Sequence, residues 1–359
     1  MKLGTIIANK FRIERVIGRG AMGVVVEATD LIIHRRIAVK LILPHHAADP
    51  QLRGRFIREA QVMTRLTTEH VARVLEVGEL PDGMLFLAME LLEGQTLEQL
   101  IQGGPLPVVD AVDLLLEALD AVVEAHSLGL VHRDIKPSNM FLAARKGKPP
   151  ILKMLDFGIV KDTQNAQRLT ATGTLPGTPA YMAPEQVAME EHLIDARADV
   201  WALGITLYEI LTGDVPFTGS MNEMLTKIRS QAPPRLRAKR PDVAPELENV
   251  INRCLSKHPT DRYANAGELA AALQDIRQRG LLRSERGAER REVQTEMSIV
   301  RRNARDAPTE ADSGVVPAAT ALAAPKKSGS GALIVMLLLL TVVAVIALVV
   351  AMKTRLIPH

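Results

Sequence analysis

The sequence has a single cysteine, few aromatic residues and almost no net charge. One cysteine, Cys254, cannot form an intrachain disulfide, which fits a reducing compartment. The apolar neighbours Val250, Ile251 and Leu255 indicate one helix face, so we expect a buried, inert thiol. Aromatic residues make up 3% and the net charge is +3, so nothing indicates a nucleic-acid partner. Residues 1–10 lack the long apolar segment of a signal peptide.

Two kinds of periodicity divide the first 280 residues. Short β-rich segments over the first ninety residues predict strands at 11–18, 24–29, 35–43 and 84–92. One helix is predicted among them, at 52–66, and longer apolar helices follow at 108–129 and 198–213. A strand-rich part followed by a helix-rich part favours an α+β chain of two lobes. The boundaries that we predict are about 1–90 and 94–280.

The last part of the chain has a different composition. Residues 281–331 are rich in Arg, Glu, Ala, Pro, Ser and Gly and lack an apolar stripe, which predicts a disordered linker. The next 21 residues, 332–352, carry no charge. At about 1.5 Å per residue they would span about 31 Å, close to the hydrocarbon thickness of a bilayer. We interpret them as one transmembrane helix rather than a buried core helix, followed by a short tail at 353–359.

A glycine-rich stretch, IGRGAMGVVV, places Gly18, Gly20 and Gly23 in the pattern G-x-G-x-x-G. A dinucleotide-binding loop with this spacing opens a helix, whereas here residues 24–26 continue a strand. The pattern therefore favours a strand–turn–strand flap, in which glycine lets backbone N–H groups approach phosphate oxygens. By itself the motif is equally compatible with a plain hairpin.

Lys40 lies inside the apolar strand IAVKLIL. A buried ammonium group needs a partner, because burying a lone charge is costly. Glu59, in the helix predicted at 52–66, is the natural candidate, and such a pair would hold a phosphate at a fixed point. An ordinary surface ion pair is the alternative.

The stretch HRDIKPSN, at 132–139, gathers charged and polar groups that neither a helix nor a strand requires. Asp134 is suited to orient a substrate hydroxyl and accept its proton. Asn139 and Asp156, the latter in MLDFGIVK, are suited to coordinate Mg²⁺, and Lys136 to neutralise charge on a transferred group. Each alone is also compatible with a solvated loop charge or a helix cap.

The order of these motifs is what distinguishes the chain: glycine flap, Lys, Glu, HRD-x-K-x-x-N and DFG. In this order the chain resembles the eukaryotic-like (Hanks-type) protein kinases, and most closely the membrane-anchored serine/threonine kinases of bacteria. The resemblance extends from about Phe11 to about Ile276. It implies a two-lobed protein kinase fold over 1–280, with ATP and Mg²⁺ as cofactors and Mn²⁺ as an alternative metal. It also implies transfer of the γ-phosphate to Ser/Thr hydroxyls of protein substrates.

The resemblance assigns a role to each matching residue. The residues implied to bind ATP are Gly18, Gly20, Gly23, Val25, Ala38, Lys40, Glu59, Met89, Glu90, Leu92 and Phe141. Asp134 is the implied base, and Asn139 and Asp156 are the implied metal ligands. Lys136 and Thr178 are implied to act beside the base and to select Ser/Thr over Tyr substrates.

Three further residues are implied to frame the site. Glu185, in the segment 177–185 that resembles the peptide-substrate loop, is expected to pair with Arg262. Asp199 is expected to brace the catalytic loop.

Regulation is expected to act on the segment between Asp156 and Glu185. A phosphate on Thr170, Thr172 or Thr174 would order this segment against Arg133, and autophosphorylation is expected at Thr172 or Thr174. The alternative is that these are solvated loop hydroxyls. Because ATP and Mg²⁺ are cytoplasmic, we expect a single-pass inner-membrane protein whose kinase domain faces the cytoplasm. The sequence is compatible with either a monomer or a homodimer.

Two other functional classes remain to be distinguished. A pseudokinase scaffold would have lost one of Lys40, Asp134, Asn139 or Asp156, and all four are present. A small-molecule phosphotransferase of related fold usually lacks the peptide-substrate segment, which is present at 177–185.

Overall fold

The structure is a computed structural model that describes residues 2–20, 23–42, 50–157 and 179–282. All of them belong to one compact unit of the chain. The transmembrane helix predicted at 332–352 and nearly all of the predicted linker lie outside the described residues. Within the described ranges, no helix is both long and apolar enough to cross a bilayer.

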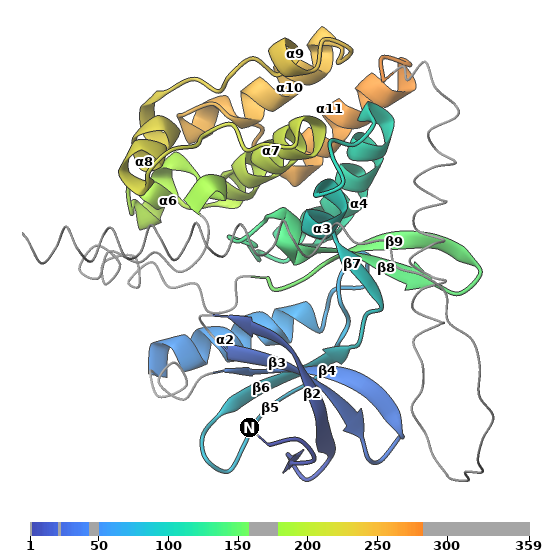
Figure 1. Ribbon diagram of the computed structural model, residues 1–359. Helices are drawn as coiled ribbons and strands as arrows, with labels where there is room; N and C mark the ends of the chain where they lie inside the picture. Colours follow the sequence, from blue (N-terminus) through green and yellow to red (C-terminus); the bar gives the residue numbers. More distant parts are fainter. Residues whose placement is uncertain (1, 21–22, 43–49, 158–178, 283–359) are drawn as a thin grey trace, which may run out of the picture. The chain divides into compact units, whose positions relative to one another are not determined.

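The N-terminal lobe is a six-stranded antiparallel sheet in the order β1-β2-β3-β4-β6-β5 (Figure 1). Its strands are β1 Ile6–Ile7, β2 Phe11–Gly20, β3 Gly23–Asp30, β4 Arg35–Ile42, β5 Val74–Glu79 and β6 Leu85–Glu90. One helix, α2 (Pro50–Met63), belongs to the same lobe and contributes Phe56, Ala60 and Met63 to the main hydrophobic core. These three positions follow the helical spacing that predicted the element.

Strand β4 shows how the sheet positions the site. Its residues Ile37, Val39 and Leu41 are buried in a small core of the N-terminal lobe. Because side chains alternate along a strand, Ala38 and Lys40 face the opposite side of the sheet. Antiparallel register places Val25 of β3 opposite Lys40 and Met89 of β6 opposite Ala38. Residues from three strands thus meet on one face.

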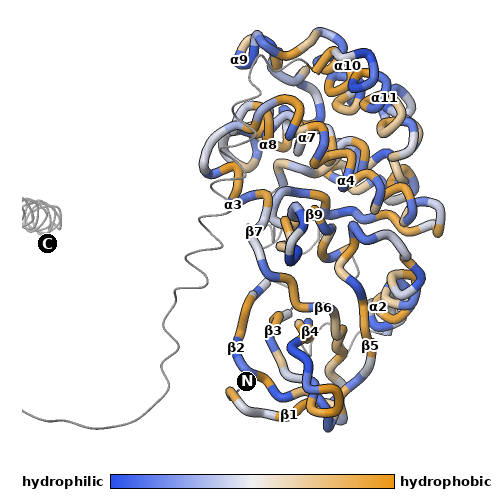
Figure 2. The backbone as a smooth tube through the Cα atoms, turned by 90° about the vertical axis from the view of Figure 1, so that its right-hand side faces the viewer, coloured by the Kyte–Doolittle hydropathy of each residue, from blue (hydrophilic) through white to orange (hydrophobic). Residues whose placement is uncertain are grey.

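The C-terminal lobe is built mainly of helices. Its helices are α3 Leu97–Ile101, α4 Val108–Ser127, α6 Pro184–Val187, α7 Ala196–Thr212, α8 Met221–Ser230, α9 Leu236–Lys239, α10 Pro245–Cys254 and α11 Ala266–Gln278. Both α4 and α7 carry long hydrophobic stretches (Figure 2), and nearly every residue of α7 is buried, including Trp201. A Cβ at Gly204 of α7 would lie 2.5 Å from the Cβ of Cys254, so glycine permits the close approach of α10.

A small sheet, β7-β8-β9, lies beside α4, and its hairpin β8–β9 connects the loop at 132–139 to Asp156 (Figure 1). Its strands are β7 Gly94–Thr96, β8 Met140–Arg145 and β9 Lys148–Met154. The β8–β9 hairpin contains the basic stretch AARKGKPPILK. Two backbone hydrogen bonds connect this sheet to the segment between α2 and β5. Ala72 N–H donates to Met154 O at 3.1 Å, and Met154 N–H donates to His70 O at 2.7 Å.

The predicted elements are confirmed within a few residues. Strands β2, β3, β4 and β6 correspond to the four predicted strands, and helices α2, α4 and α7 to the three predicted helices. Helix α7 ends at Gly213, whose φ of +80° is the left-handed conformation that glycine favours. Cys254 is buried as expected, and burial raises the pKa of its thiol to about 12.

Candidate active site

A buried carboxylate holds the loop between α4 and β8. Asp199 of α7 is fully buried, and its two oxygens accept hydrogen bonds from the backbone N–H groups of His132 and Arg133, each at 2.8 Å. His126 of α4 donates a third hydrogen bond from Nε2, at 2.9 Å. Arg133 has a φ of +62°, which is unfavourable for a residue with a side chain. The bond from its own N–H group to Asp199 helps to hold that conformation. Asp199 therefore braces the loop, as predicted.

His132 connects this loop to the segment that carries Asp156. Its fully buried ring donates from Nε2 to Leu155 O at 3.0 Å and accepts at Nδ1 from the N–H of Asp134 at 3.3 Å. The ring also packs against Phe157, with 4.5 Å between centroids. Burial lowers the pKa of His132, which favours the neutral ring that this bonding pattern requires.

Lys136 and Asn139 both donate hydrogen bonds to the carboxylate of Asp134. Lys136 Nζ donates to Asp134 Oδ2 at 3.0 Å, and Asn139 Nδ2 donates to the same oxygen at 3.0 Å and to Asp134 O at 2.8 Å. The short helix η1, Pro137–Asn139, makes the turn that brings Asn139 back to Asp134. Asp134 is partly exposed and thus open to a ligand. The structure brings together the three side chains predicted from the HRD-x-K-x-x-N spacing.

The ion pair of Lys40 differs from the prediction. Lys40 Nζ donates to Asp156 Oδ1 at 2.7 Å, and this carboxylate, not that of Glu59, is its partner. Glu59 instead lines a cavity together with Arg58 and Arg133, and Lys40 is not one of the residues that line it. Asp156 has a left-handed φ of +51° and lies beside β4 through this contact.

The predicted metal ligands offer the oxygen atoms that magnesium prefers. The amide nitrogen of Asn139 faces Asp134, which leaves its amide oxygen for a ligand. The N–H of Leu155 donates to Asn139 O at 2.8 Å. Asp156 is the next residue in the chain, so this bond holds the two predicted metal ligands near each other. In the part of the chain that the structure describes, no group of three or more His, Cys, Asp or Glu residues could hold a metal ion. The donor set fits Mg²⁺ bound jointly with phosphate oxygens and water.

Some of the predicted nucleotide-binding residues are neighbours in the sheets: Val25 lies opposite Lys40, and Met89 opposite Ala38. Gly18 pairs with Val25 in the β2–β3 register, and Phe141 of β8 pairs with Thr96 of β7. A Cβ at Gly23 would lie 2.0 Å from Leu41 O, so packing alone requires glycine there. At Gly20 no atom lies within 4 Å of an added Cβ, so packing does not require glycine at this position.

The side chain of Glu90 takes part in the fold. Glu90 Oε1 accepts hydrogen bonds from Arg73 N–H, at 2.9 Å, and from Lys153 Nζ, at 2.8 Å. It therefore links β6 to β9. Met89 and Leu92, on either side of it, are half-buried.

A buried ion pair supports the far side of the site. Arg262 donates from Nη1 and Nη2 to the two carboxylate oxygens of Glu185, at 2.7 and 2.8 Å, and both residues are buried. The guanidinium also donates to the backbone oxygens of Arg197, Ser256 and Lys257. The predicted pair between Glu185 and Arg262 is confirmed.

Residues 11–274 match the model of the protein kinase domain. The chain belongs to the protein kinase family. It is 38% identical over 281 residues to serine/threonine-protein kinase pkn3 of Myxococcus xanthus, covering 76% of this chain and 51% of that protein. It is also 38% identical to serine/threonine-protein kinase PknE of Mycobacterium bovis, covering 73% of this chain and 45% of that protein. The chain spans about half the length of these relatives or less.

Solved kinase structures share the fold. The PknI kinase domain of Mycobacterium tuberculosis aligns with a TM-score of 0.61 at 29% identity, covering 77% of this chain and 98% of that one. Rad53 1–466, solved in complex with AMP-PNP, aligns with a TM-score of 0.59 at 26% identity, covering 73% of this chain and 64% of that one. The expected two-lobed kinase fold is therefore confirmed over the described lobes.

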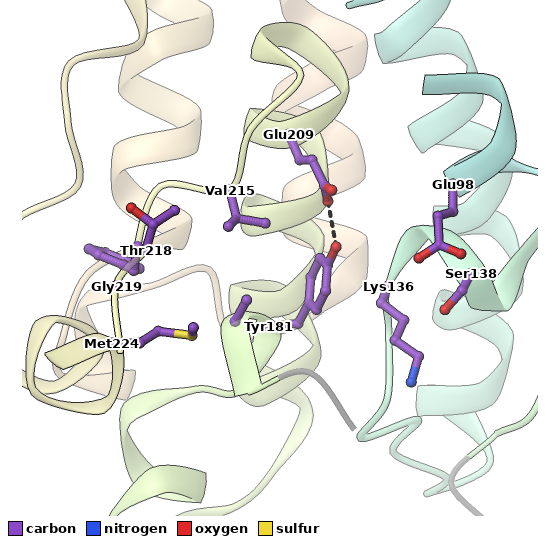
Figure 3. A pocket seen from close by; sticks show the side chains of 11 residues that line it. Glu98, Lys136, Ser138, Tyr181, Glu209, Val215, Thr218, Gly219 and Met224 are labelled. Atoms are coloured by element: carbon purple, nitrogen blue, oxygen red, sulfur yellow. Dashed lines mark hydrogen bonds between the residues drawn. The ribbon is translucent and has the colours of Figure 1, made fainter. Parts of the chain in front are cut away.

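Some predicted residues of the kinase domain lie outside the described residues, namely Thr170, Thr172, Thr174 and Thr178. Other contributors were missed from the sequence. His126 donates to Asp199 from the last turn of α4, and only this place near the helix end could have suggested it. Tyr181 and Glu209 meet beside the catalytic loop, joined by a hydrogen bond of 2.6 Å (Figure 3). No local pattern in the sequence connects these two residues.

Proposed function

We propose that this chain is an active protein serine/threonine kinase that transfers the γ-phosphate of ATP to Ser/Thr hydroxyls of proteins. The observation that carries the proposal is the convergence of Lys136 and Asn139 on the carboxylate of Asp134. Asp156 and Lys40 lie next to this group in the same kinase domain. The relatives named above, all called serine/threonine-protein kinases, support the choice of hydroxyl substrate.

Each side chain has a role in the proposed reaction. Asp134 accepts a hydrogen bond from the substrate hydroxyl, orients it and takes its proton. Lys136, held at 3.0 Å from Asp134, offsets negative charge on the transferred group. Asn139 and Asp156 would hold Mg²⁺, which supplies neutralisation of phosphate charge when bound with ATP. Lys136 beside the base, and Thr178 by resemblance, favour Ser/Thr over Tyr.

The nucleotide is proposed to bind between the glycine flap and β8. Val25, Ala38, Met89, Leu92 and Phe141 would contact the adenine. The room around Gly20 supports close approach of the flap backbone to phosphates. Since Asp156 is both the partner of Lys40 and a metal ligand in this proposal, metal binding would compete with that ion pair. Lys40 would then exchange Asp156 for Glu59, the partner that the family resemblance implies.

The first prediction concerns the proposed base. Asp134→Asn keeps the size of the side chain but cannot take a proton, so the rate of phosphate transfer should fall by about 10² to 10⁴. The measurement is labelled phosphate transferred from ATP and Mg²⁺ to protein, and EDTA should abolish it in the wild type. Asp275→Asn, an exposed carboxylate on α11, is the matched control and should retain full activity. Equal rates for Asp134→Asn and wild type, or no transfer by either, would contradict the proposal and favour a scaffold.

We also propose that autophosphorylation between Asp156 and Glu185 activates the kinase. A cavity of about 150 Å³ is lined by two arginines, Arg58 and Arg133, and by Glu59. Arg133 Nε is buried, and among the described residues it has no hydrogen-bond partner. A phosphate on Thr172 or Thr174 would supply acceptor oxygens for these arginines.

The second prediction tests this activation. Phosphopeptide mapping of active enzyme should find phosphate between residues 161 and 178, at Thr172 or Thr174. The double variant Thr172→Ala/Thr174→Ala and the variant Arg133→Ala should each lower activity about tenfold or more. Arg133→Ala keeps the backbone N–H that Asp199 binds, so the loop should stay braced. Active enzyme with no phosphate in that segment would refute the idea.

We further propose that residues 332–352 anchor the kinase in the inner membrane, with the kinase domain in the cytoplasm. The support is the uncharged 21-residue run and the cytoplasmic location of ATP. The third prediction is that deleting 332–359 leaves phosphate transfer intact and moves the protein from the membrane to the soluble fraction. Continued sedimentation with membranes after this deletion would rule out the anchor.

A further inference from the structure

One stretch of the C-terminal lobe carries charged residues of a single sign. Between Glu223 and Asp242 the sequence contains basic residues and no acidic one. The basic residues are Lys227, Arg229, Arg235, Arg237, Lys239 and Arg240. The proposed phosphate transfer uses none of them. A positive stretch of this density is typical of a surface that binds a polyanion.

The fold holds this stretch firmly against the lobe. Leu236 of α9 is buried, and Arg240 Nη1 donates to the backbone oxygen of Leu211 at 2.7 Å. These inward contacts fix the path of the chain on both sides of α9. Arg235 and Arg237, which flank the buried leucine, are exposed. The arginine side chains are therefore presented to solvent from a fixed backbone.

Three of the arginines carry a charge that no carboxylate neutralises. Lys239 and Arg240 each have a carboxylate partner, at 2.9 and 2.8 Å. By contrast, Arg229, Arg235 and Arg237 are exposed and form no ion pair with any residue that the structure describes. We call these three residues the arginine edge. Each guanidinium can bond two oxygens of a phosphate group at once.

One end of the arginine edge lies beside the last described residues. Helix α10 contacts both α9 and α11, and the three helices lie together at one end of the C-terminal lobe (Figure 1, Figure 2). In the first turn of α10, Glu248 accepts a hydrogen bond from the N–H of Arg237 at 2.9 Å. In the same turn, Glu246 lies 4.0 Å from Arg279, which directly follows α11. The described chain ends three residues later, at Leu282.

The chain that follows favours a lipid surface as the partner of the arginine edge. The residues 283–331 separate Leu282 from the uncharged run at 332–352. A flexible chain of this length has a root-mean-square span of about 40 Å. In the proposed anchored protein the arginine edge would thus stay near the cytoplasmic leaflet, whose anionic lipids attract clustered arginines. This tether raises the local concentration of lipid far above that of a freely diffusing polyanion.

We propose that the arginine edge docks on anionic lipid headgroups of the membrane that anchors the kinase. The three guanidinium groups bind headgroup phosphates, and the lobe lies on the leaflet through α9 and the last turn of α8. The inference goes beyond the proposed function and uses its membrane anchor. Helices α9 and α11 lie at the end of the C-terminal lobe away from the six-stranded sheet (Figure 1). Docking there leaves the catalytic residues open to protein substrates.

The test uses the full-length chain in lipid nanodiscs. The discs contain either neutral phosphatidylcholine alone or a mixture with anionic phosphatidylglycerol, and an acceptor dye is attached to some headgroups. The variant Ala238→Cys carries the donor dye at an exposed position of α9, and the native Cys254 is buried. Energy transfer should be about twofold or more higher in anionic discs than in neutral ones at low salt. High salt should remove the difference, because it screens exposed charges.

Two triple variants locate the effect, both in the Ala238→Cys background. In the first, every residue of the arginine edge is changed to Gln, and energy transfer in anionic discs should fall to the level of neutral discs. The matched control removes the same charge from three exposed basic residues elsewhere, in Arg35→Gln/Arg65→Gln/Lys146→Gln. This control should keep the wild-type difference. Phosphate transfer to a soluble protein should stay near the wild-type rate in both, which shows that they are folded.

Three results would overturn the inference. The first is equal energy transfer in neutral and anionic discs for the chain with an intact arginine edge. The second is an undiminished difference in the variant that lacks the arginine edge. The third is binding of duplex DNA that disappears with the arginine edge while lipid composition has no effect, which would assign this surface to nucleic acid.

The same discs separate this inference from the proposed anchor. Co-elution with neutral discs reports the anchor, because these discs offer no net charge to the arginine edge. A chain that leaves neutral discs but stays with anionic discs at low salt supports the docking surface and contradicts the anchor. A chain that stays with both kinds of disc at equal energy transfer supports the anchor and refutes the docking surface.

Discussion

The structure depends on one buried carboxylate that touches no proposed substrate. Asp199 is fully buried in α7, and burial of a charged group is costly unless several donors satisfy it. Its donors are the side chain of His126 and the backbone of His132 and Arg133. Because two of the three are backbone groups, Asp199 fixes the path of the loop itself. A left-handed φ at Arg133 persists within that bonded arrangement.

From this anchor, a continuous set of hydrogen bonds reaches the reacting groups. His132 links the loop to Leu155 and to the backbone of Asp134, and Asp134 in turn gathers Lys136 and Asn139. Lys40 and Asp156 form a more exposed contact, in which the carboxylate is 40% accessible. The fixed part of the site therefore positions the base, and the exchangeable part lies where nucleotide and metal would bind.

The sequence was sufficient where its motifs match those of the kinase family. The brace at Asp199 and the pair of Glu185 with Arg262 were predicted from that resemblance, and the structure gives the physical reason for them: these charges are buried and each one is satisfied by hydrogen bonds. The partner of Lys40 was not predictable, since the sequence offers both Glu59 and Asp156 as carboxylates, and only the structure shows that Asp156 takes the ammonium while Glu59 lines another cavity. The contact between Tyr181 and Glu209 was not predictable either, because the two residues are 28 positions apart and only the tertiary fold brings them together.

The most direct test of this account is the effect of Asp199→Asn on phosphate transfer and on ATP binding. An amide at this position offers N–H groups to backbone donors, so the loop should lose its brace while the nucleotide-binding strands stay intact. We predict a fall in kcat of about 10²-fold, as expected for misplaced catalytic groups, with the Kd for ATP changed less than about threefold. Asp195→Asn, at the cap of the same helix, should leave kcat near the wild-type value. An unchanged kcat in Asp199→Asn would contradict the account.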